Sequence, residues 1–214
     1  MHTGGATTDT ELERGLRALG VDVALAAPLL AYLDELLRWN RAFNLTAVRD
    51  PAAAVPRHLL DSLSLLPLLG PGDLLDVGTG AGLPGVPLAL AEPQRRCVLL
   101  DSGGKKIRFV RHVALLLGLD NVTPVQARAE DYREAGSFGN VVSRAFADVG
   151  RFVALAGHLC APDGRLLAMK GTDPTHELDA LPAGFAVSEV HRVVVPGLSA
   201  QRHVVELRRT ASAM

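Results

Sequence analysis

The sequence predicts an α/β protein: a mostly parallel, seven-stranded sheet preceded by a helical extension. A glycine-rich turn follows the apolar run Leu74–Val77, a pattern typical of a buried strand that leads into a helix. Apolar runs and helical patterns then alternate, as they do where crossover helices join parallel strands. The last two runs, Val187–Val195 and His203–Leu207, are separated only by a short turn around Pro196 and Gly197. Because so short a connection permits only an antiparallel pair, we expect an antiparallel hairpin to close the sheet.

Length and composition limit the possible organisation. The 214 residues suffice for one compact unit, with a helical extension over residues 1–70 and an α/β domain over residues 71–210. The net charge of −1 excludes nucleic-acid binding through overall charge, so any RNA contact requires a local basic patch. Cys97 and Cys160 lack the spacing of metal ligands, so we expect no metal and a reducing, cytoplasmic location. The sequence contains neither a secretory signal pattern nor an apolar stretch of membrane-spanning length, so we expect no membrane partner.

The extension is predicted to contain three helices. The first begins at Thr8 in a capping-box pattern and ends before Gly20. The second covers Leu25–Ala42, where leucines recur at helical spacing. The third begins near Pro51, which follows an aspartate suited to the N-cap.

The α/β domain is predicted from alternating patterns. Its parallel strands are expected at Leu74–Val77, Cys97–Leu100, Val122–Val125, Val141–Val142 and Leu166–Met169. Its helices are expected at Val86–Ala91, Lys105–Leu117, Val149–Leu159 and Thr175–Leu181. Pro124 is unusual inside a strand, because proline lacks the N–H group that a ladder needs.

The glycine-rich turn carries the first functional signal. Residues 76–82 read D-x-G-x-G-x-G, an order typical of sites that bind S-adenosylmethionine (SAM). Glycines let backbone N–H groups approach a nucleotide-like ligand, so Gly78, Thr79, Gly80 and Gly82 are candidate cofactor contacts. Gly80, Gly82 and Gly85 also satisfy the dinucleotide pattern G-x-G-x-x-G. In dinucleotide sites, however, the first glycine of that pattern ends the strand directly, whereas Gly78 does so here.

Further candidates follow the other predicted strands, because ligands bind at the carboxyl ends of parallel strands. Asp101 lies about twenty residues beyond the turn, where a carboxylate accepts ribose hydroxyls, although it also suits a helix N-cap. A backbone amide of Ala129 or Glu130 would hold an adenine edge. Ser143 and Arg144 follow the fourth strand, near the expected reactive methyl. Arg144 would contact a cofactor carboxylate or a guanine edge, or form a structural ion pair.

Basic residues near these strand ends predict a rim for RNA. The helix from Lys105 places Arg108, Arg111 and His112 at spacings of three and four residues, which indicates one positive stripe. The candidate RNA-binding residues are Arg57, His58, Lys105, Lys106, Arg108, Lys170, Arg202 and His203. His58 and Asp61 share a helix face, which fits acid–base work but more often a structural hydrogen bond.

The chain resembles the bacterial 16S rRNA guanine-N7 methyltransferases, the glucose-inhibited division protein B family. The resemblance covers about residues 40–208 and follows the order of the family's motifs. The matching segments are Asn44-Leu45-Thr46, Arg57-His58 with Asp61-Ser62, the glycine turn continued by Leu83-Pro84-Gly85, Leu100-Asp101-Ser102 with Lys105-Lys106, Arg128-Ala129-Glu130, Ser143-Arg144-Ala145, Lys170-Gly171 and Arg202-His203. One departure is Ala81, where many members carry proline.

The resemblance implies a Rossmann-like SAM-dependent methyltransferase fold and methylation of N7 of a guanine in the 530 loop of 16S rRNA. It implies SAM as the methyl donor, with cofactor contacts at Gly78, Leu83, Ala129, Glu130 and Arg144 and with Asp101 near the ribose. The positioning residues near the methyl would be Arg144 and Ser143. The partner would be 16S rRNA or the small ribosomal subunit, and we expect a monomer.

Three other functions fit parts of the pattern. A nicotinamide-dependent oxidoreductase would usually need a Tyr-x-x-x-Lys motif, which neither Tyr32 nor Tyr132 provides. A non-catalytic RNA-binding module of ribosome assembly would not need Asp101 and Arg144. A methyltransferase for a small molecule or a protein is disfavoured only by the basic rim.

Overall fold

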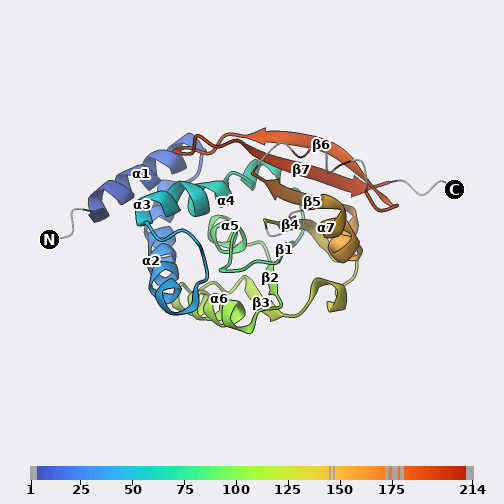
Figure 1. Ribbon diagram of the computed structural model, residues 1–214, viewed down its shortest axis with the longest axis horizontal. Helices are drawn as coiled ribbons and strands as arrows, with labels where there is room; N and C mark the ends of the chain where they lie inside the picture. Colours follow the sequence, from blue (N-terminus) through green and yellow to red (C-terminus); the bar gives the residue numbers. More distant parts are fainter. Residues whose placement is uncertain are drawn as a thin grey trace.

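The computed structural model describes residues 4–144, 146, 148–171, 174, 178 and 181–210. Its seven strands form one sheet in the order β3-β2-β1-β4-β5-β7-β6 (Figure 1). Strand β7 pairs antiparallel with β5 and β6, and the neighbours from β3 to β5 are parallel. The predicted sheet and its closing hairpin are therefore confirmed. The strands are β1 Leu74–Val77, β2 Cys97–Asp101, β3 Val122–Gln126, β4 Phe138–Ser143, β5 Cys160–Lys170, β6 Phe185–Val193 and β7 Arg202–Arg209.

The sheet order creates a switch point beside β1. From β1 the chain moves outward through β2 to the edge strand β3, then returns to place β4 on the other side of β1. The crossover helices are α5 Gly85–Ala91, α6 Gly104–Leu116 and α7 Val149–Ala156. The loops after β1 and β4 therefore diverge at the carboxyl edge of the sheet, where open α/β proteins bind their ligands.

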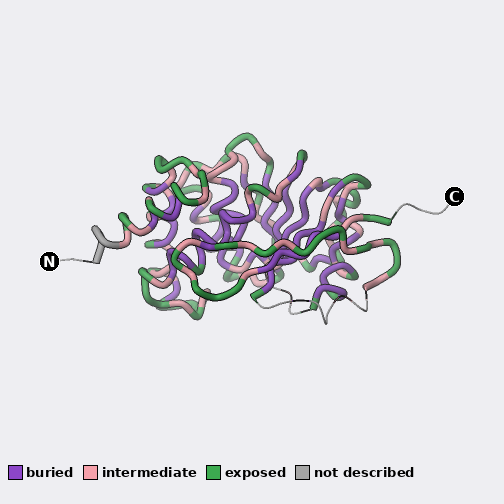
Figure 2. Tube along the Cα trace, turned by 90° about the horizontal axis from the view of Figure 1, so that it is seen from above, coloured by how far each residue is buried: buried purple, intermediate pink, exposed green. Residues whose placement is uncertain are grey.

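Successive residues of the strands feed two separate cores. Leu74 and Leu99 face a core shared with α5, α6 and the helical extension, whereas Leu75 and Leu100 face a core shared with α7. Figure 1 shows α5 on the side of the extension and α7 on the opposite side of the sheet. Buried backbone runs through the interior along the strands, with exposed loops around it (Figure 2). Leu12 and Leu36 of the extension belong to the same core cluster as the sheet, so the two predicted parts pack as one body.

The extension differs from prediction in two places. Helix α1 spans Gly4–Ala18, so Thr8 lies inside the helix and is not its N-cap. Helix α2 spans Ala26–Phe43, close to the predicted range. After it come α3 Pro51–Ala54, the π-helical segment η2 Val55–Leu60 and α4 Asp61–Leu63. The sequence pattern did not indicate the π-helix, a form that is frequent at functional sites. The short 3-10 turns of this part are η1 Val23–Leu25 and η3 Leu66–Leu68.

Two further expectations of the α/β domain are resolved. Pro124 is tolerated because β3 is an edge strand with only one neighbour in the sheet. The helix expected over 149–159 divides into α7 and the 3-10 turn η5 Gly157–Leu159. A similar 3-10 turn, η4 Ala129–Asp131, follows β3. The helix expected at Thr175–Leu181 lies largely outside the described residues.

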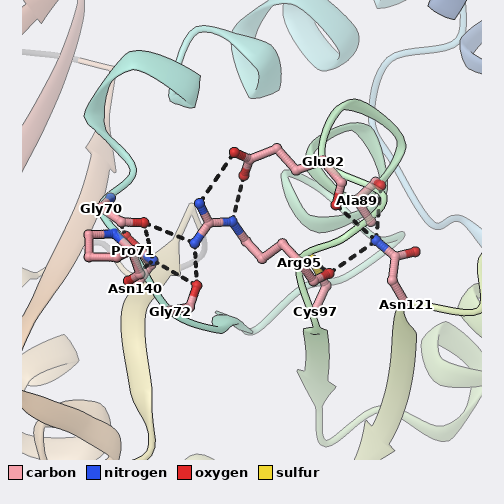
Figure 3. A network of polar contacts seen from close by, with 9 residues as sticks. All are labelled: Gly70, Pro71, Gly72, Ala89, Glu92, Arg95, Cys97, Asn121 and Asn140. Atoms are coloured by element: carbon pink, nitrogen blue, oxygen red, sulfur yellow. Dashed lines mark hydrogen bonds and ion pairs between the residues drawn. The ribbon is translucent and has the colours of Figure 1, made fainter.

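The amino edge of the sheet is closed by side chains that bind backbone carbonyls (Figure 3). Arg95 donates to the carbonyls of Gly70 and Gly72 and pairs with Glu92. Asn140 at the start of β4 also donates to the Gly70 carbonyl, at 3.0 Å. Asn121 donates to three carbonyls between α5 and β2. This network ties the connections before β1, β2 and β3 to one another and to β4, opposite the edge where β1 meets its glycine turn.

Candidate active site

Asp76 holds the glycine-rich turn from inside β1. Its fully buried carboxylate accepts hydrogen bonds from Thr79 Oγ1 at 2.6 Å and from Gly85 N at 2.8 Å. Burial raises the pKa of Asp76 to about 6, although the bonds from Thr79 and Gly85 oppose the shift. Gly78 and Gly80 take φ values of 71° and 60°, a region that favours glycine. The turn thus presents backbone without side chains at the carboxyl edge.

Tyr32 fixes the same turn from the helical extension. Its buried hydroxyl donates to the carbonyl of Ala81 at 2.8 Å, across 49 positions of the sequence. Burial raises the pKa of this phenol above its ordinary value, so the hydroxyl stays a donor. Helix α2 is therefore part of the support of the turn, a role that the sequence did not indicate.

Asp101, at the end of β2, joins the turn to the start of α6. Its Oδ2 accepts from Gly80 N at 3.0 Å and lies 3.2 Å from Lys106 Nζ, while Oδ1 accepts from Gly103 N at 2.7 Å. Gly103, and not Asp101, is the N-cap residue of α6. Asp101 is 6% exposed and lines a surface hollow, and its contact with a ribose stays a prediction.

Two hollows meet at Gly78. The larger, of about 240 Å³, is lined by Asp101, Ala129 and Glu130 together with Phe146 from the far core. The smaller, of about 170 Å³, lies between the turn and the extension, and its lining residues are Leu45, Thr46, Gly78, Thr79, Gly80, Ala81, Leu83 and Arg144. The predicted cofactor residues are thus gathered around the two hollows, apart from Gly82. Gly82 lines neither hollow, and a Cβ there would lie 2.6 Å from Val86, so the glycine permits close packing of the turn on α5; its contact with a cofactor stays a prediction.

Arg144 is fixed by an acid from the extension. Asp61, whose side chain is 3% exposed, accepts from Arg202 Nε at 2.9 Å and faces Arg144 Nη1 at 3.4 Å. The same Arg144 nitrogen donates to the Arg57 carbonyl at 3.1 Å. One carboxylate therefore orients two guanidinium groups from the ends of β4 and β7.

His58 and Ser143 have structural partners near this cluster. His58 Nε2 lies 2.8 Å from Thr46 Oγ1, and its other ring nitrogen bonds to the Arg57 carbonyl. Burial, with a smaller contribution from Arg144, lowers the pKa of His58 to about 4, so the ring is neutral at pH 7. Ser143 Oγ donates to the Val77 carbonyl at 2.7 Å and so joins β4 to the end of β1. The described contacts of His58 are with Thr46 and Arg57 rather than with Asp61.

The predicted basic rim is only partly a surface feature. Arg57, Lys105 and Arg108 are exposed. His58, Lys170 and His203 are buried, and Lys170 lies opposite His203 in the ladder of β5 and β7. Lys106 pairs with Asp101 and lines the larger hollow. His112 does not continue the stripe, because it bonds Glu35 and stacks on Trp39 of α2. Ala145 lies outside the described residues.

Comparisons with known proteins show the family. The family model described as rRNA small subunit methyltransferase G matches residues 26–205. The chain belongs to this family. Ribosomal RNA small subunit methyltransferase G of Xanthomonas oryzae pv. oryzae (strain MAFF 311018) is 50% identical over 198 residues, which is 92% of this chain and 93% of the relative. The protein of that name from Stenotrophomonas maltophilia (strain K279a) is 49% identical and covers 94% of each chain.

Solved structures place the fold of this rRNA small subunit methyltransferase G family member among methyltransferases. A SAM-dependent methyltransferase from Aquifex aeolicus matches with a TM-score of 0.55 and 17% identity, over 74% of this chain and 93% of that chain. TrmN from Thermus thermophilus matches with a TM-score of 0.56 and 22% identity, over 80% and 53%. The predicted fold class is confirmed.

The structure adds residues that the sequence did not single out. Tyr32 carried no local signal, because its partner lies in another part of the chain. Asp61 was named for its spacing from His58 and as part of a segment that matches the family, but its partners Arg144 and Arg202 were not predicted. Among the described residues, no three His, Cys, Asp or Glu side chains are grouped to hold a metal ion, and no helix suits a membrane span.

Proposed function

We propose that this protein transfers a methyl group from SAM to N7 of a guanine in the 530 loop of 16S rRNA. The proposal rests most on the two hollows that meet at the bare backbone of Gly78, one bordered by Asp101 and the other by Arg144. The family name gives the reaction class and the small-subunit RNA. The position and atom of methylation come from the resemblance in the sequence motifs.

The residues around the turn fit SAM. A nucleoside needs a carboxylate for its ribose, and Asp101 stands at the larger hollow with Ala129 and Glu130 on the adenine side. The methionine part of SAM needs backbone groups that can approach it closely and a cation to pair with its carboxylate. The smaller hollow offers Gly80 for the first and Arg144 for the second. Thr79 and Leu83 complete that side of the cradle.

The chemistry requires positioning more than proton transfer. When bound, SAM supplies a methyl group on a sulfonium, which a nucleophile attacks in line. Guanine N7 already carries a lone pair, so no side chain has to remove a proton. The neutral His58 is consistent with a reaction that needs no general base, because its ring is engaged in a hydrogen bond to Thr46, a residue that lines the smaller hollow. Arg144, held by Asp61, orients the reactants at the same hollow. Holding the reactants in place lowers the entropic cost of reaching the transition state.

The substrate side is expected around the hollows. Arg57, Lys105 and Arg108 are exposed cations, and we expect them to contact phosphates of the RNA. Other RNA-binding candidates differ in exposure: Arg202 is partly exposed and pairs with Asp61, whereas Lys170 and His203 are buried opposite each other between β5 and β7. We expect a monomer that acts in the cytoplasm on 16S rRNA or on the small subunit.

Mass mapping of 16S rRNA tests the proposal. Cells that lack the protein should lose one methyl group on a guanine of the 530 loop, and wild-type protein should restore it. Gly80→Asp should fail to restore it, because a side chain at the turn blocks the hollow. Unchanged rRNA in the deleted cells contradicts the proposal. Titration with SAM and with NADH tests the oxidoreductase alternative, which requires binding of NADH.

A further inference from the structure

A second polar groove lies on the extension, behind the loop that walls the smaller hollow. The groove has a volume of about 360 Å³ and is lined by Leu37, Asn40, Arg41, Asn44, Arg49 and Pro51. Its residues come from the last turns of α2 and from the loop that turns back toward α3 (Figure 1). None of these six belongs to the cradle of the methyl donor.

The polar groups of the groove are mostly donors. Arg41 and Arg49 are exposed, and neither forms an ion pair with any described residue. The nearby carboxylate of Asp50 is occupied, since it caps α3 by accepting from Ala52 N and Ala53 N. Asn40 uses Oδ1 to accept from Thr46 N at 2.9 Å, which leaves its amide NH2 as the group available to the groove. Two guanidinium groups and an amide donor suit an anion with several acceptor oxygens.

The loop between groove and hollow is rigidly braced. Asn44 ends α2 in the left-handed conformation, with φ of 50°, and turns the chain toward Leu45. Thr46 is held on two sides: its N–H donates to Asn40 Oδ1, and its hydroxyl is hydrogen-bonded to His58 Nε2. Asn44 and Arg49 therefore face the groove while Leu45 and Thr46 face the hollow. We call residues 44–46 the ridge; a strand that reaches the hollow from the side of the groove crosses it.

We propose that the Arg41–Arg49 groove binds a backbone phosphodiester of the rRNA strand that flanks the target guanine. This proposal rests on the proposed function, because it takes RNA as the substrate. A guanidinium can donate two parallel bonds to one phosphate, so two arginines on either side of the groove fix the strand's path across the ridge. The groove adds affinity and register and takes no part in the methyl transfer.

Arg41→Ala, Arg49→Ala and the double variant test the groove, with Arg38→Ala as the matched control. Arg38 is on the same helix and exposed, but it pairs with Glu35 and does not line the groove. Binding of a 16S rRNA fragment that contains the 530 loop is measured by fluorescence anisotropy over a range of salt concentrations. SAM affinity is measured by calorimetry, and methylation gives KM and kcat.

The double variant should bind the fragment at least tenfold more weakly. The slope of log K against log[salt] should fall in magnitude by about 0.7 to 0.9, which is the contribution of the one phosphate contact that is lost. SAM affinity and kcat at saturating RNA should stay within twofold of wild type. Binding and a salt slope equal to those of Arg38→Ala overturn the proposal, and point to an acidic protein segment as the occupant. The same binding and methylation assays are made with small ribosomal subunits from cells that lack the protein. Wild type that binds the fragment or the subunit but methylates neither refutes the proposed function while leaving this test intact. Wild type that binds neither refutes both.

Discussion

Tyr32→Phe removes one oxygen atom from the joint between the extension and the glycine turn. The hydroxyl and the Ala81 carbonyl are both buried and lie 2.8 Å apart. Loss of the bond costs about 1 kcal/mol, and a buried carbonyl left without its donor costs about 1 kcal/mol more. We therefore expect the free energy of unfolding to fall by about 2 kcal/mol, or roughly 4–8 °C in Tm for a chain of this size. SAM affinity should fall several-fold, because the turn loses its support.

Tyr132→Phe is the matched control for this prediction. The Tyr132 hydroxyl donates to Glu134 at 2.7 Å, but at a half-buried surface site where water can replace the bond. We expect that variant to lose less than about 1 kcal/mol. Urea unfolding followed by circular dichroism and by Trp39 fluorescence measures both variants. Equal losses would refute the assignment of Tyr32 as a support of the turn. Because the extension shares the sheet's core, we also expect both probes to report a single transition.

Five other substitutions test the site. Asp101→Ala should weaken SAM binding at least tenfold in calorimetry, since it removes the proposed ribose acceptor and the anchor of Gly80; unchanged affinity would remove Asp101 from the site. Lys106→Glu should weaken SAM binding as well, whereas Lys105→Glu should raise only the KM for RNA; identical profiles would mean that the two lysines share one role. Asp61→Asn keeps the side-chain shape but removes the charge between Arg144 and Arg202, so kcat should fall about tenfold with SAM affinity within threefold; wild-type turnover would show that Arg144 needs no such partner. Asp76→Asn tests the pKa of about 6: the raised pKa means that the folded state holds this proton more tightly, so wild-type stability should decline by up to about 3 kcal/mol as pH rises from 4 to 6. In urea titrations at several pH values, the variant should lack that decline. An equal dependence of stability on pH in both proteins would contradict the raised pKa of Asp76.

The fold was predictable because its signals are local. The strand before Gly78, the alternation after it and the short final hairpin each depend on neighbouring residues, and each is present in the structure. The turn's interior acid was also visible in the D-x-G-x-G-x-G order. That order does not indicate which residues outside the turn support it. Tyr32 and Ala81 meet only because α2 packs on the sheet's core, and no periodicity encodes that distance.

The basic residues also show that sequence patterns do not predict which side chains the tertiary packing will bury. Charge and spacing placed His112 on a stripe with Arg108, but packing turned its ring onto Trp39 and Glu35. Lys170 and His203 read as surface cations, whereas the insertion of β7 beside β5 buries both. A sequence pattern identifies the residue type at a strand end, but strand order decides whether that residue meets solvent or another strand.

Strand β7 has an interior place in the sheet, although it follows the other six along the chain. Its first residue, Arg202, pairs with Asp61, which also pairs with Arg144. The surroundings of Arg144 therefore depend on the position of β7 between β5 and β6. The contact between Arg202 and Asp61 spans 141 positions of the sequence, so the support of Arg144 depends on the helical extension and on the last strand together. A change that displaces β7 would therefore loosen Arg144 without touching the contacts of Asp101 with Gly80 and Gly103.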